Sequence, residues 1–320
     1  MFALVLAATL FSAVPLSDQH ALYEGGNNPP ADHLANGMAA AARIRPLDRN
    51  GNPSPSGKII FLSLGMSNTT QEFCSANNPA PCDSWSFVGQ ALADPAVNHS
   101  TLVLVNGASG GQDAKTWDSP DDANYDRVRD HDLGAAGFSE AQVQVAWVKQ
   151  ADANPTKSLP DPNADAYQLE TLLANTMRAM RVRYPNLQIV YLSSRIYAGY
   201  ATSTLNPEPY AYESGLAVKW LVQAQVDQMR VAGMVVDSRA GVRYPEASPW
   251  IAWGPYLWAN GMEPRSDGLT WARSEFVSDG THPAQPARQK VGKMLLDFLK
   301  SSPTSQAWFL AASRRRGVTH

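Results

Sequence analysis

The sequence predicts an α/β protein in which helices cover both faces of a mainly parallel sheet, as a three-layer α/β/α sandwich. The first observation is a series of short apolar runs rich in bulky residues, which is typical of buried strands. The second is that segments with helical periodicity stand between these runs, and such alternation produces βαβ crossovers. The third is a content of 44% hydrophobic and 17% charged residues in a chain of 320, which is enough to bury a full core.

Five apolar runs are predicted to be the strands. They lie at Lys58–Leu64, Ser100–Val105, Val143–Trp147, Leu187–Leu192 and Val231–Val236. The first run comes directly after residues 50–57, a cluster of Gly, Pro, Asn and Ser that ends regular structure. Ligands of open parallel sheets collect beyond the carboxyl ends of the strands, so the residues after each run are expected to carry the chemistry.

Three helices are predicted from apolar residues at helical spacing. They are Asp165–Tyr184, Tyr212–Arg230 and about Gln285–Lys300. The Asp- and Pro-rich stretches 118–132 and 153–165 are interpreted as loops of the same scaffold rather than as linkers between domains.

The chain begins with an uncharged, Ala-rich apolar segment, Phe2–Leu16. Its length suits the hydrophobic region of an export signal and is short for a stable membrane span. No Lys or Arg precedes it, and a buried N-terminal helix or strand is the alternative interpretation. We therefore expect a signal-like leader over residues 1–20, an N-terminal extension over 21–57, the main domain over 58–302 and a C-terminal tail over 303–320.

The two cysteines, Cys74 and Cys82, lie close together in a Pro- and Asn-rich segment. This suits a small disulfide-closed loop formed in an oxidising compartment, so we expect a secreted or periplasmic protein. Two free thiols are the alternative. A metal site is not expected, because no further Cys or His stands near the two sulfur atoms.

The charge of the chain argues against nucleic acid as a partner. The net charge is −3, and basic residues do not cluster before Arg314, Arg315 and Arg316. Such a surface gives no long-range attraction for a phosphate backbone.

Two motifs follow the first two strands. Gly65-Met-Ser67-Asn68 places a serine on a tight turn, where its hydroxyl and its backbone N–H can lie at the rim of the sheet. Ser67 could instead be a plain helix cap. In the second motif, residues 106–111, Gly110 and Gly111 let the backbone approach a ligand and donate N–H groups, although a plain Gly-rich turn is the alternative.

The strongest motif is Asp279-Gly-Thr-His282, directly before the last predicted helix. An imidazole beside a serine hydroxyl can take its proton, and a carboxylate three residues earlier can bind the other ring nitrogen and fix the tautomer. A loop histidine satisfied by its surroundings is the alternative. None of the other five histidines has an Asp at this spacing.

In this order the motifs resemble the SGNH/GDSL hydrolase superfamily, in detail its carbohydrate acetylesterase and sialate O-acetylesterase branch. Gly65–Asn68 matches the Gly-Gln-Ser-Asn block of that branch except at Met66, and Asp279–His282 matches its last block. Gly110 and Gly111, with Trp117 downstream, resemble its second block. The resemblance spans about Lys58 to Leu299.

The resemblance implies an SGNH hydrolase domain with a five-stranded flavodoxin-like sheet and a serine esterase that needs no cofactor. Ser67 would be the nucleophile, His282 the general base and Asp279 the residue that orients the imidazole. The backbone N–H groups of Ser67 and of Gly110 or Gly111 would form the oxyanion hole.

The third block of the family departs from its pattern in this chain. The family has a Trp-x-Gln-Gly-Glu segment whose amide helps to bind the oxyanion, whereas this chain has Trp147-Val-Lys149-Gln150-Ala-Asp152. Lys149 stands at the amide position by count, so we expect it, rather than Gln150, to be the side-chain donor. Alternation along a strand lets only one of the two reach the oxyanion, and the backbone acting alone is the third possibility.

Substrate contacts are expected from Asn68, Trp117, Trp253 and Trp258. Aromatic rings at a cleft would stack on sugars, while packing in the core is the alternative for each ring. The expected function is hydrolysis of small acyl esters, above all acetyl esters of carbohydrates. A lipase- or thioesterase-like activity and a catalytically silent carbohydrate-binding protein are the alternatives.

Overall fold

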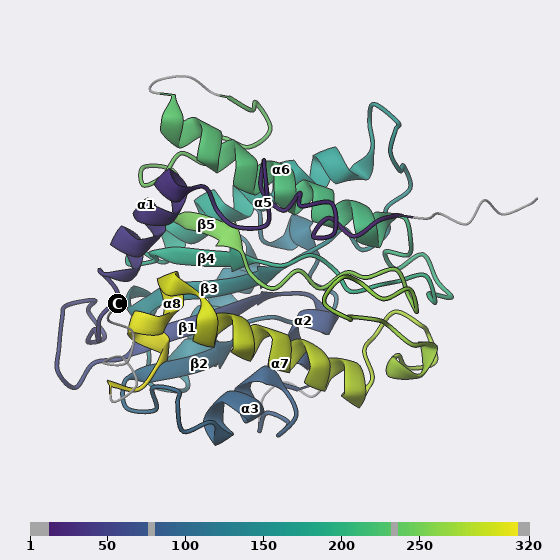
Figure 1. Cartoon of the computed structure of the whole chain (residues 1–320). Helices are drawn as coiled ribbons and strands as arrows, with labels where there is room; N and C mark the ends of the chain where they lie inside the picture. Colours follow the sequence, from purple (N-terminus) through teal and green to yellow (C-terminus); the bar gives the residue numbers. More distant parts are fainter. Residues whose placement is uncertain (1–12, 76–80, 232–235, 313–320) are drawn as a thin grey trace, which may run out of the picture.

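The computed structural model describes residues 13–75, 81–231 and 236–312, and its centre is a five-stranded sheet with the order β2-β1-β3-β4-β5. All neighbouring strands are parallel, which confirms the predicted flavodoxin-like sheet (Figure 1). The strands are β1 (Ile59–Gly65), β2 (Leu102–Asn106), β3 (Val143–Lys149), β4 (Ile189–Leu192) and β5 (Trp250–Trp253).

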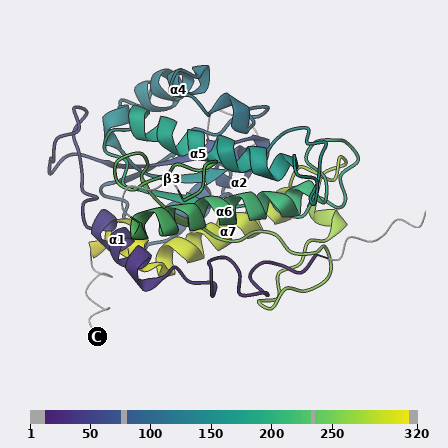
Figure 2. The same cartoon turned by 90° about the horizontal axis from the view of Figure 1, so that it is seen from above.

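Helices cover both faces of this sheet, as Figures 1 and 2 show. Helices α5 (Asp165–Arg183) and α6 (Tyr210–Arg230) pack on one face, while α2 (Ser67–Phe73), α3 (Phe87–Ala93) and α7 (Gln285–Ser301) pack on the other. The three helices predicted from periodicity are thus present. The remaining helices are α1 (Ala31–Ala41), α4 (Ala123–Arg127) and α8 (Pro303–Phe309).

The alternation of side chains along β1 produces two separate apolar cores. Ile60, Leu62 and Leu64 face the α5 and α6 layer, whereas Ile59 and Phe61 face the opposite layer. All seven residues of β1 are buried, which explains why the strand reads as a continuous apolar run rather than as an alternating one.

The fifth strand differs from the sequence prediction. The predicted strand Val231–Val236 lies mostly outside the described residues, and neither of its described ends, Val231 and Val236, is in a strand. The sheet is completed instead by β5, a Trp-Ile-Ala-Trp segment in which every residue is buried. Its tryptophans fill the core at the edge of the sheet, because a large ring buries more apolar area there than a short branched side chain.

Segments from both ends of the chain pack on this scaffold. Helix α1 contacts α8 and β5, and Trp308 and Phe309 of α8 are buried in the same core as Phe61. In the N-terminal segment, residues 1–12 lie outside the described part, while Leu16 is buried and donates its N–H to the Tyr256 hydroxyl at 3.2 Å.

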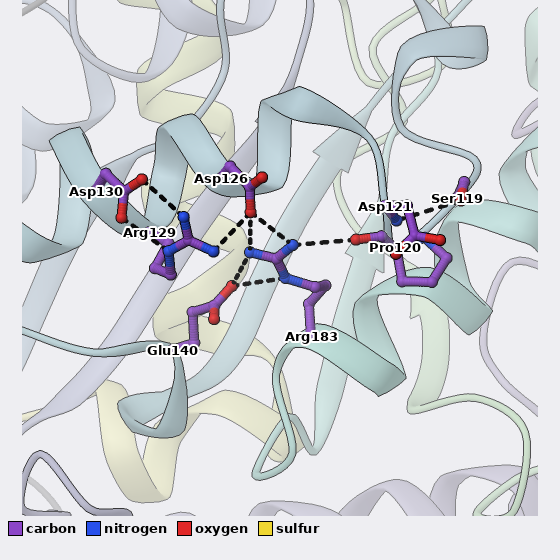
Figure 3. Close-up of polar contacts among 8 residues, drawn as sticks. All are labelled: Ser119, Pro120, Asp121, Asp126, Arg129, Asp130, Glu140 and Arg183. Carbon is purple, nitrogen blue, oxygen red and sulfur yellow. Dashed lines mark hydrogen bonds and ion pairs between the residues drawn. The ribbon is translucent and has the colours of Figure 1, made fainter.

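An ion-pair network joins α4 and the π-helical turn Val128–Gly134 to the end of α5 (Figure 3). Arg183 contacts Asp126 at 3.0 Å and Glu140 at 2.8 Å, and Arg129 contacts Asp126 at 2.7 Å. This network lies near the amino ends of the strands, because α5 ends at Arg183 and β4 begins at Ile189. Ser67 lies at the opposite, carboxyl ends of the strands. No helix in the described ranges is long and apolar enough to cross a membrane.

Candidate active site

The turn between β1 and α2 brings Ser67 to the carboxyl edge of the sheet. Gly65 ends β1, and Ser67 is the first residue of α2. A Cβ atom at position 65 would lie 2.3 Å from the Lys149 carbonyl oxygen and 2.4 Å from Thr69 Oγ1. Only glycine therefore fits where β1 passes the end of β3 and turns into the helix.

Ser67, His282 and Asp279 form one hydrogen-bonded chain. The Ser67 Oγ atom lies 2.8 Å from His282 Nε2, and His282 Nδ1 lies 2.5 Å from Asp279 Oδ2. Ser67 and His282 are half-buried, so the chain of bonds ends at an accessible hydroxyl. A carboxylate on Nδ1 keeps the proton on that nitrogen and leaves Nε2 free to accept the serine proton.

The loop that carries Asp279 and His282 is held by its own backbone. Asp279 Oδ1 accepts the N–H groups of Thr281 at 2.9 Å and His282 at 3.0 Å. Gly280 has φ of 68°, and a Cβ atom there would lie 1.8 Å from the Tyr200 carbonyl oxygen. The Thr202 N–H donates to the Asp279 carbonyl at 2.9 Å, so the segment after β4 supports this loop.

These contacts also set the charge state of Asp279. Burial raises the pKa of this carboxyl, but the hydrogen bonds from the His282 side chain and from the backbone N–H groups outweigh it, and the pKa lies below its ordinary value. Asp279 thus stays ionised over the range in which an imidazole works as a base.

The glycine motif after β2 lies beside the serine. A Cβ atom at Gly110 would be 3.8 Å from the Ser67 Cβ, and Gly111 has φ of 75°. Gly110 is an exposed residue, and no hydrogen bond from its N–H to a described residue is present. At the end of β2, Asn106 Oδ1 accepts a hydrogen bond from Ser63 Oγ at 2.7 Å, and Asn106 Nδ2 donates to Thr70 Oγ1 at 2.6 Å. These bonds connect β1, β2 and α2.

Lys149 does not have the contacts expected of an oxyanion donor. Its ammonium lies 2.7 Å from Glu72 Oε1 and 2.5 Å from Glu72 Oε2, and both side chains are almost completely buried. Burial lowers the pKa of Lys149 to about 8 and raises that of Glu72, although the close contact keeps the two as an ion pair. The preference for Lys149 over Gln150 therefore loses its support.

The reason is the side of the sheet on which Lys149 lies. It shares the face of Trp147, as alternation predicts, and that face is covered by α2, on which Glu72 lies. Gln150 follows β3, and its Nε2 lies 3.3 Å from the Gln112 carbonyl oxygen, next to the glycine motif. Its buried Oε1 has no hydrogen-bond partner within the described ranges.

The four expected substrate contacts are all buried. Trp117 and Trp258 are 0% exposed and pack in the core, while Trp253 is 4% exposed and borders a cavity together with Leu22 and Tyr23 of the N-terminal segment. Asn68 is 2% exposed and donates its amide to the Thr281 carbonyl at 3.1 Å. It joins the helix of Ser67 to the loop of His282, which is a positioning contact.

Cys74 and Cys82, eight residues apart, form a disulfide, as predicted. Cys74 directly follows α2, so the covalent link closes the loop that begins where the helix of Ser67 ends. Residues 76–80 of that loop lie outside the described part.

Sequence reasoning missed two charged residues near the site, Glu72 and Arg195. Arg195 follows β4 and is 3% exposed, and its buried Nε and Nη2 atoms have no hydrogen-bond partner among the described residues. Burial lowers its pKa, against the attraction of Glu72, Glu208 and Asp279. The only sequence signal was a charged residue near the carboxyl end of each of two buried strands, Lys149 as the last residue of β3 and Arg195 shortly after β4.

Comparisons with known proteins find matches of low sequence identity among solved structures. No family model matches the sequence, and no curated protein matches it. A protein from Parabacteroides merdae described as a GDSL-like lipase has 13% identity and a TM-score of 0.42, over 78% of this chain and 96% of its own.

Two further solved structures are comparable. An extracellular lipase from Streptomyces rimosus has 14% identity and a TM-score of 0.38, over 75% of this chain and 98% of its own. A family two carbohydrate esterase from Cellvibrio japonicus has 11% identity and a TM-score of 0.40, over 80% of this chain and 64% of its own.

Proposed function

We propose that this chain is a serine esterase that hydrolyses small acyl esters, with acetyl esters of carbohydrates as its substrate class. The observation that carries the proposal is the chain of contacts from Ser67 Oγ to His282 Nε2 and from His282 Nδ1 to Asp279. A serine hydroxyl is a weak nucleophile until an adjacent base accepts its proton, and this arrangement supplies the base and the group that orients it.

The reaction begins with attack of Ser67 Oγ on the ester carbonyl carbon while His282 takes the hydroxyl proton. The carbonyl oxygen becomes an oxyanion. In this proposal the N–H groups of Ser67 and Gly110 donate hydrogen bonds to it. His282 then returns the proton to the leaving alkoxide, which departs as the alcohol and leaves an acyl-serine. Water, deprotonated by His282, releases the acid and restores Ser67.

The surroundings of Ser67 suit an ester with a small acyl group and a large alcohol part. Gly110 and Gly111 are exposed beside Ser67, so the alcohol side of a large substrate can lie over the rim. The expected aromatic contacts are buried, and carbohydrate as the alcohol therefore rests on the sequence resemblance. The disulfide supports the further proposal of a secreted or periplasmic location.

The test is covalent labelling with a fluorophosphonate probe, read by intact mass. The wild-type protein should gain one label and Ser67→Ala none. His282→Ala should gain a label only at a much lower rate, because the Ser67 hydroxyl then lacks its base. Labelling of Ser67→Ala at the wild-type rate would show that another residue is the nucleophile. Absence of labelling in the folded wild-type protein would favour the silent carbohydrate-binding alternative.

Nitrophenyl esters of increasing chain length distinguish the esterase from a lipase- or thioesterase-like enzyme. Turnover that is highest with acetyl and falls with each longer chain supports the small-acyl proposal. A maximum at long chains would assign the site to lipid esters instead.

A further inference from the structure

The glycine loop, residues 107–112, follows β2 and lies in neither a helix nor a strand. Its beginning is attached to β1, since the Gly107 N–H donates to the Ser63 carbonyl oxygen at 3.1 Å. The Ser109 N–H likewise donates to the Gly65 carbonyl oxygen at 3.0 Å. The two glycines that come next in the loop need further contacts to keep one conformation, because glycine restricts the backbone least.

Two side chains of helix α4, Asn124 and Arg127, contact the two ends of the glycine loop. Arg127 Nη2 donates to the Gly107 carbonyl oxygen at 2.6 Å. Asn124 Nδ2 donates to Gln112 Oε1 at 2.8 Å. Residues three apart lie on the same face of a helix, so one short helix reaches both ends of the loop at once.

The two α4 side chains are themselves held in place. Arg127 Nη1 lies 2.6 Å from Asp132 Oδ2, and the guanidinium lies over the Trp117 ring, 5.9 Å from its centroid. Asn124 is 8% exposed, and its Nδ2 also donates to the Thr116 carbonyl oxygen at 3.0 Å. Side chains locked by several partners hold a site more precisely than mobile ones, so α4 provides fixed donors to the loop.

The bond from Arg127 matters most at Gly107, which is a buried residue. A buried carbonyl that loses its donor costs about 1–3 kcal/mol, and a charged donor makes a stronger bond than a neutral one. Three residues later, Gly110 lies beside Ser67, with a Cβ-to-Cβ distance of 3.8 Å for a side chain built at position 110. Loss of the Arg127 bond therefore loosens the loop close to the proposed nucleophile.

Gln112 connects α4 to the other candidate oxyanion donor, Gln150. The Gln112 side chain accepts from Asn124, and its carbonyl oxygen accepts from Gln150 Nε2 at 3.3 Å. Helix α4 thus reaches the segment of Gly110 through Gly107, and reaches Gln150 through Gln112.

We propose that Asn124 and Arg127 are positioning residues that hold the glycine loop where the Gly110 N–H can donate to the oxyanion. The inference rests on the proposed function, because an oxyanion forms only when Ser67 attacks an ester. Neither side chain contacts the substrate, and each acts through the loop. A displacement of about 1 Å can lower turnover about a hundredfold, and an interaction made only in the transition state affects kcat rather than substrate binding.

Arg127→Lys separates the bond to the loop from the charge. A lysine keeps an ammonium for Asp132 but lacks the planar fork that reaches Asp132 and Gly107 at once. On one acetyl ester we expect kcat to fall about tenfold to a hundredfold with little change in KM. Asn124→Asp keeps the size of the side chain but has no donor for Gln112 Oε1, and it should lower kcat in the same direction.

Inhibition by phenylboronic acid distinguishes a positioning role from a loss of stability. The boronic acid adds to the Ser67 hydroxyl as a tetrahedral anion, so its binding depends on the oxyanion donors as the transition state does. Its Ki should rise in both variants by the factor by which kcat/KM falls. A partly unfolded preparation would lose turnover in proportion to its active fraction and keep the wild-type Ki.

Arg129→Lys is the matched control. Arg129 also pairs with aspartates, Asp126 and Asp130, at 2.7 Å each, and Figure 3 shows it pointing toward them. None of its contacts in the described part of the chain is with the glycine loop, so kcat and Ki should keep their wild-type values.

Wild-type values of kcat or Ki in Arg127→Lys and Asn124→Asp, or equal losses in Arg127→Lys and Arg129→Lys, would overturn the positioning role alone. A folded wild-type protein that neither hydrolyses the ester nor binds phenylboronic acid would overturn the proposed function, and this inference with it.

Discussion

At the scale of single residues, the proposed mechanism depends on the hydrogen bond between Asp279 and Nδ1 of His282. Asp279→Asn keeps an oxygen for the backbone N–H groups of Thr281 and His282 but can present an amide N–H to Nδ1. The imidazole then carries its proton on Nε2 and cannot accept the Ser67 proton. We expect kcat to fall on the order of 10³–10⁴-fold, with little change in KM.

The measurement is a steady-state profile on one acetyl ester, with Ser67→Ala and His282→Ala beside it. The loss in Asp279→Asn should be no larger than in either of these two variants. Near-normal turnover in Asp279→Asn, with Tm unchanged, would remove Asp279 from the mechanism.

Substitutions of Lys149 and Gln150 should affect different properties, stability for Lys149 and turnover for Gln150. Lys149→Met leaves the Glu72 carboxylate buried without its partner, which destabilises a protein by about 3–5 kcal/mol. The double variant Glu72→Gln/Lys149→Met should recover part of this loss, because neither charge is then left unpaired. Gln150→Ala should leave the free energy of unfolding nearly unchanged and lower kcat by about tenfold to a hundredfold.

Urea unfolding and turnover on the same preparations decide between these roles. A Lys149→Met protein that is as stable as wild type but has lost turnover would restore Lys149 as the oxyanion donor. Full activity in both single variants would leave the oxyanion to backbone N–H groups.

How far the site could be predicted depends on whether its partners are local in sequence. Asp279 and His282 lie three residues apart and follow from spacing, because most of the hydrogen bonds that orient them lie within the loop itself. The ion pair of Lys149 with Glu72 joins residues 77 positions apart. It exists only because α2 packs on the Trp147 face of β3, and no local pattern contains that information.

At the scale of elements, four of the five strands and three long helices follow from periodicity, while β5 does not. Its four residues are buried on both faces and include two tryptophans, so neither alternation nor branched residues mark it. The stretch Val231–Val236 has the stronger strand composition but no partner in the sheet among its described residues. Pairing with β4, rather than propensity, selects β5.

The disulfide acts on α2, the short helix that begins at Ser67. Cys74 follows its last residue, and the link to Cys82 limits the unfolded chain around the serine turn. Cys74→Ser/Cys82→Ser should lower the free energy of unfolding by about 2–3 kcal/mol. The loss should be equal to that caused by reduction of the wild-type protein, as measured by urea unfolding.

Intact mass after alkylation without reductant is the control for this comparison. Wild-type protein from an oxidising compartment should take up no alkyl group. Two alkylated thiols would contradict the disulfide, and the double variant should then be as stable as the wild-type protein.

At the scale of the whole molecule, two sets of carboxyls act in opposite directions on stability. Asp279, Asp267 and Asp94 have pKa values below the ordinary value, because charge-assisted hydrogen bonds outweigh burial. Their contribution is present above the pKa of the unfolded chain, 3.8, and is lost as the pH falls through the folded values. Glu213 and Asp152 behave in the opposite way, because burial raises their pKa to about 7 and about 6.

For Glu213 and Asp152 the folded state binds more protons than the unfolded chain, whose values are 4.5 and 3.8. Their contribution is complete below those values and is lost as the pH rises through about 6–7, so the free energy of unfolding should decline from pH 5 to pH 8. Glu213→Gln should reduce this decline without abolishing it, because a neutral amide does not titrate while Asp152 still does. Urea unfolding of both proteins at pH 5, 6, 7 and 8 measures this effect, and a decline that is identical in Glu213→Gln would show that other groups cause it.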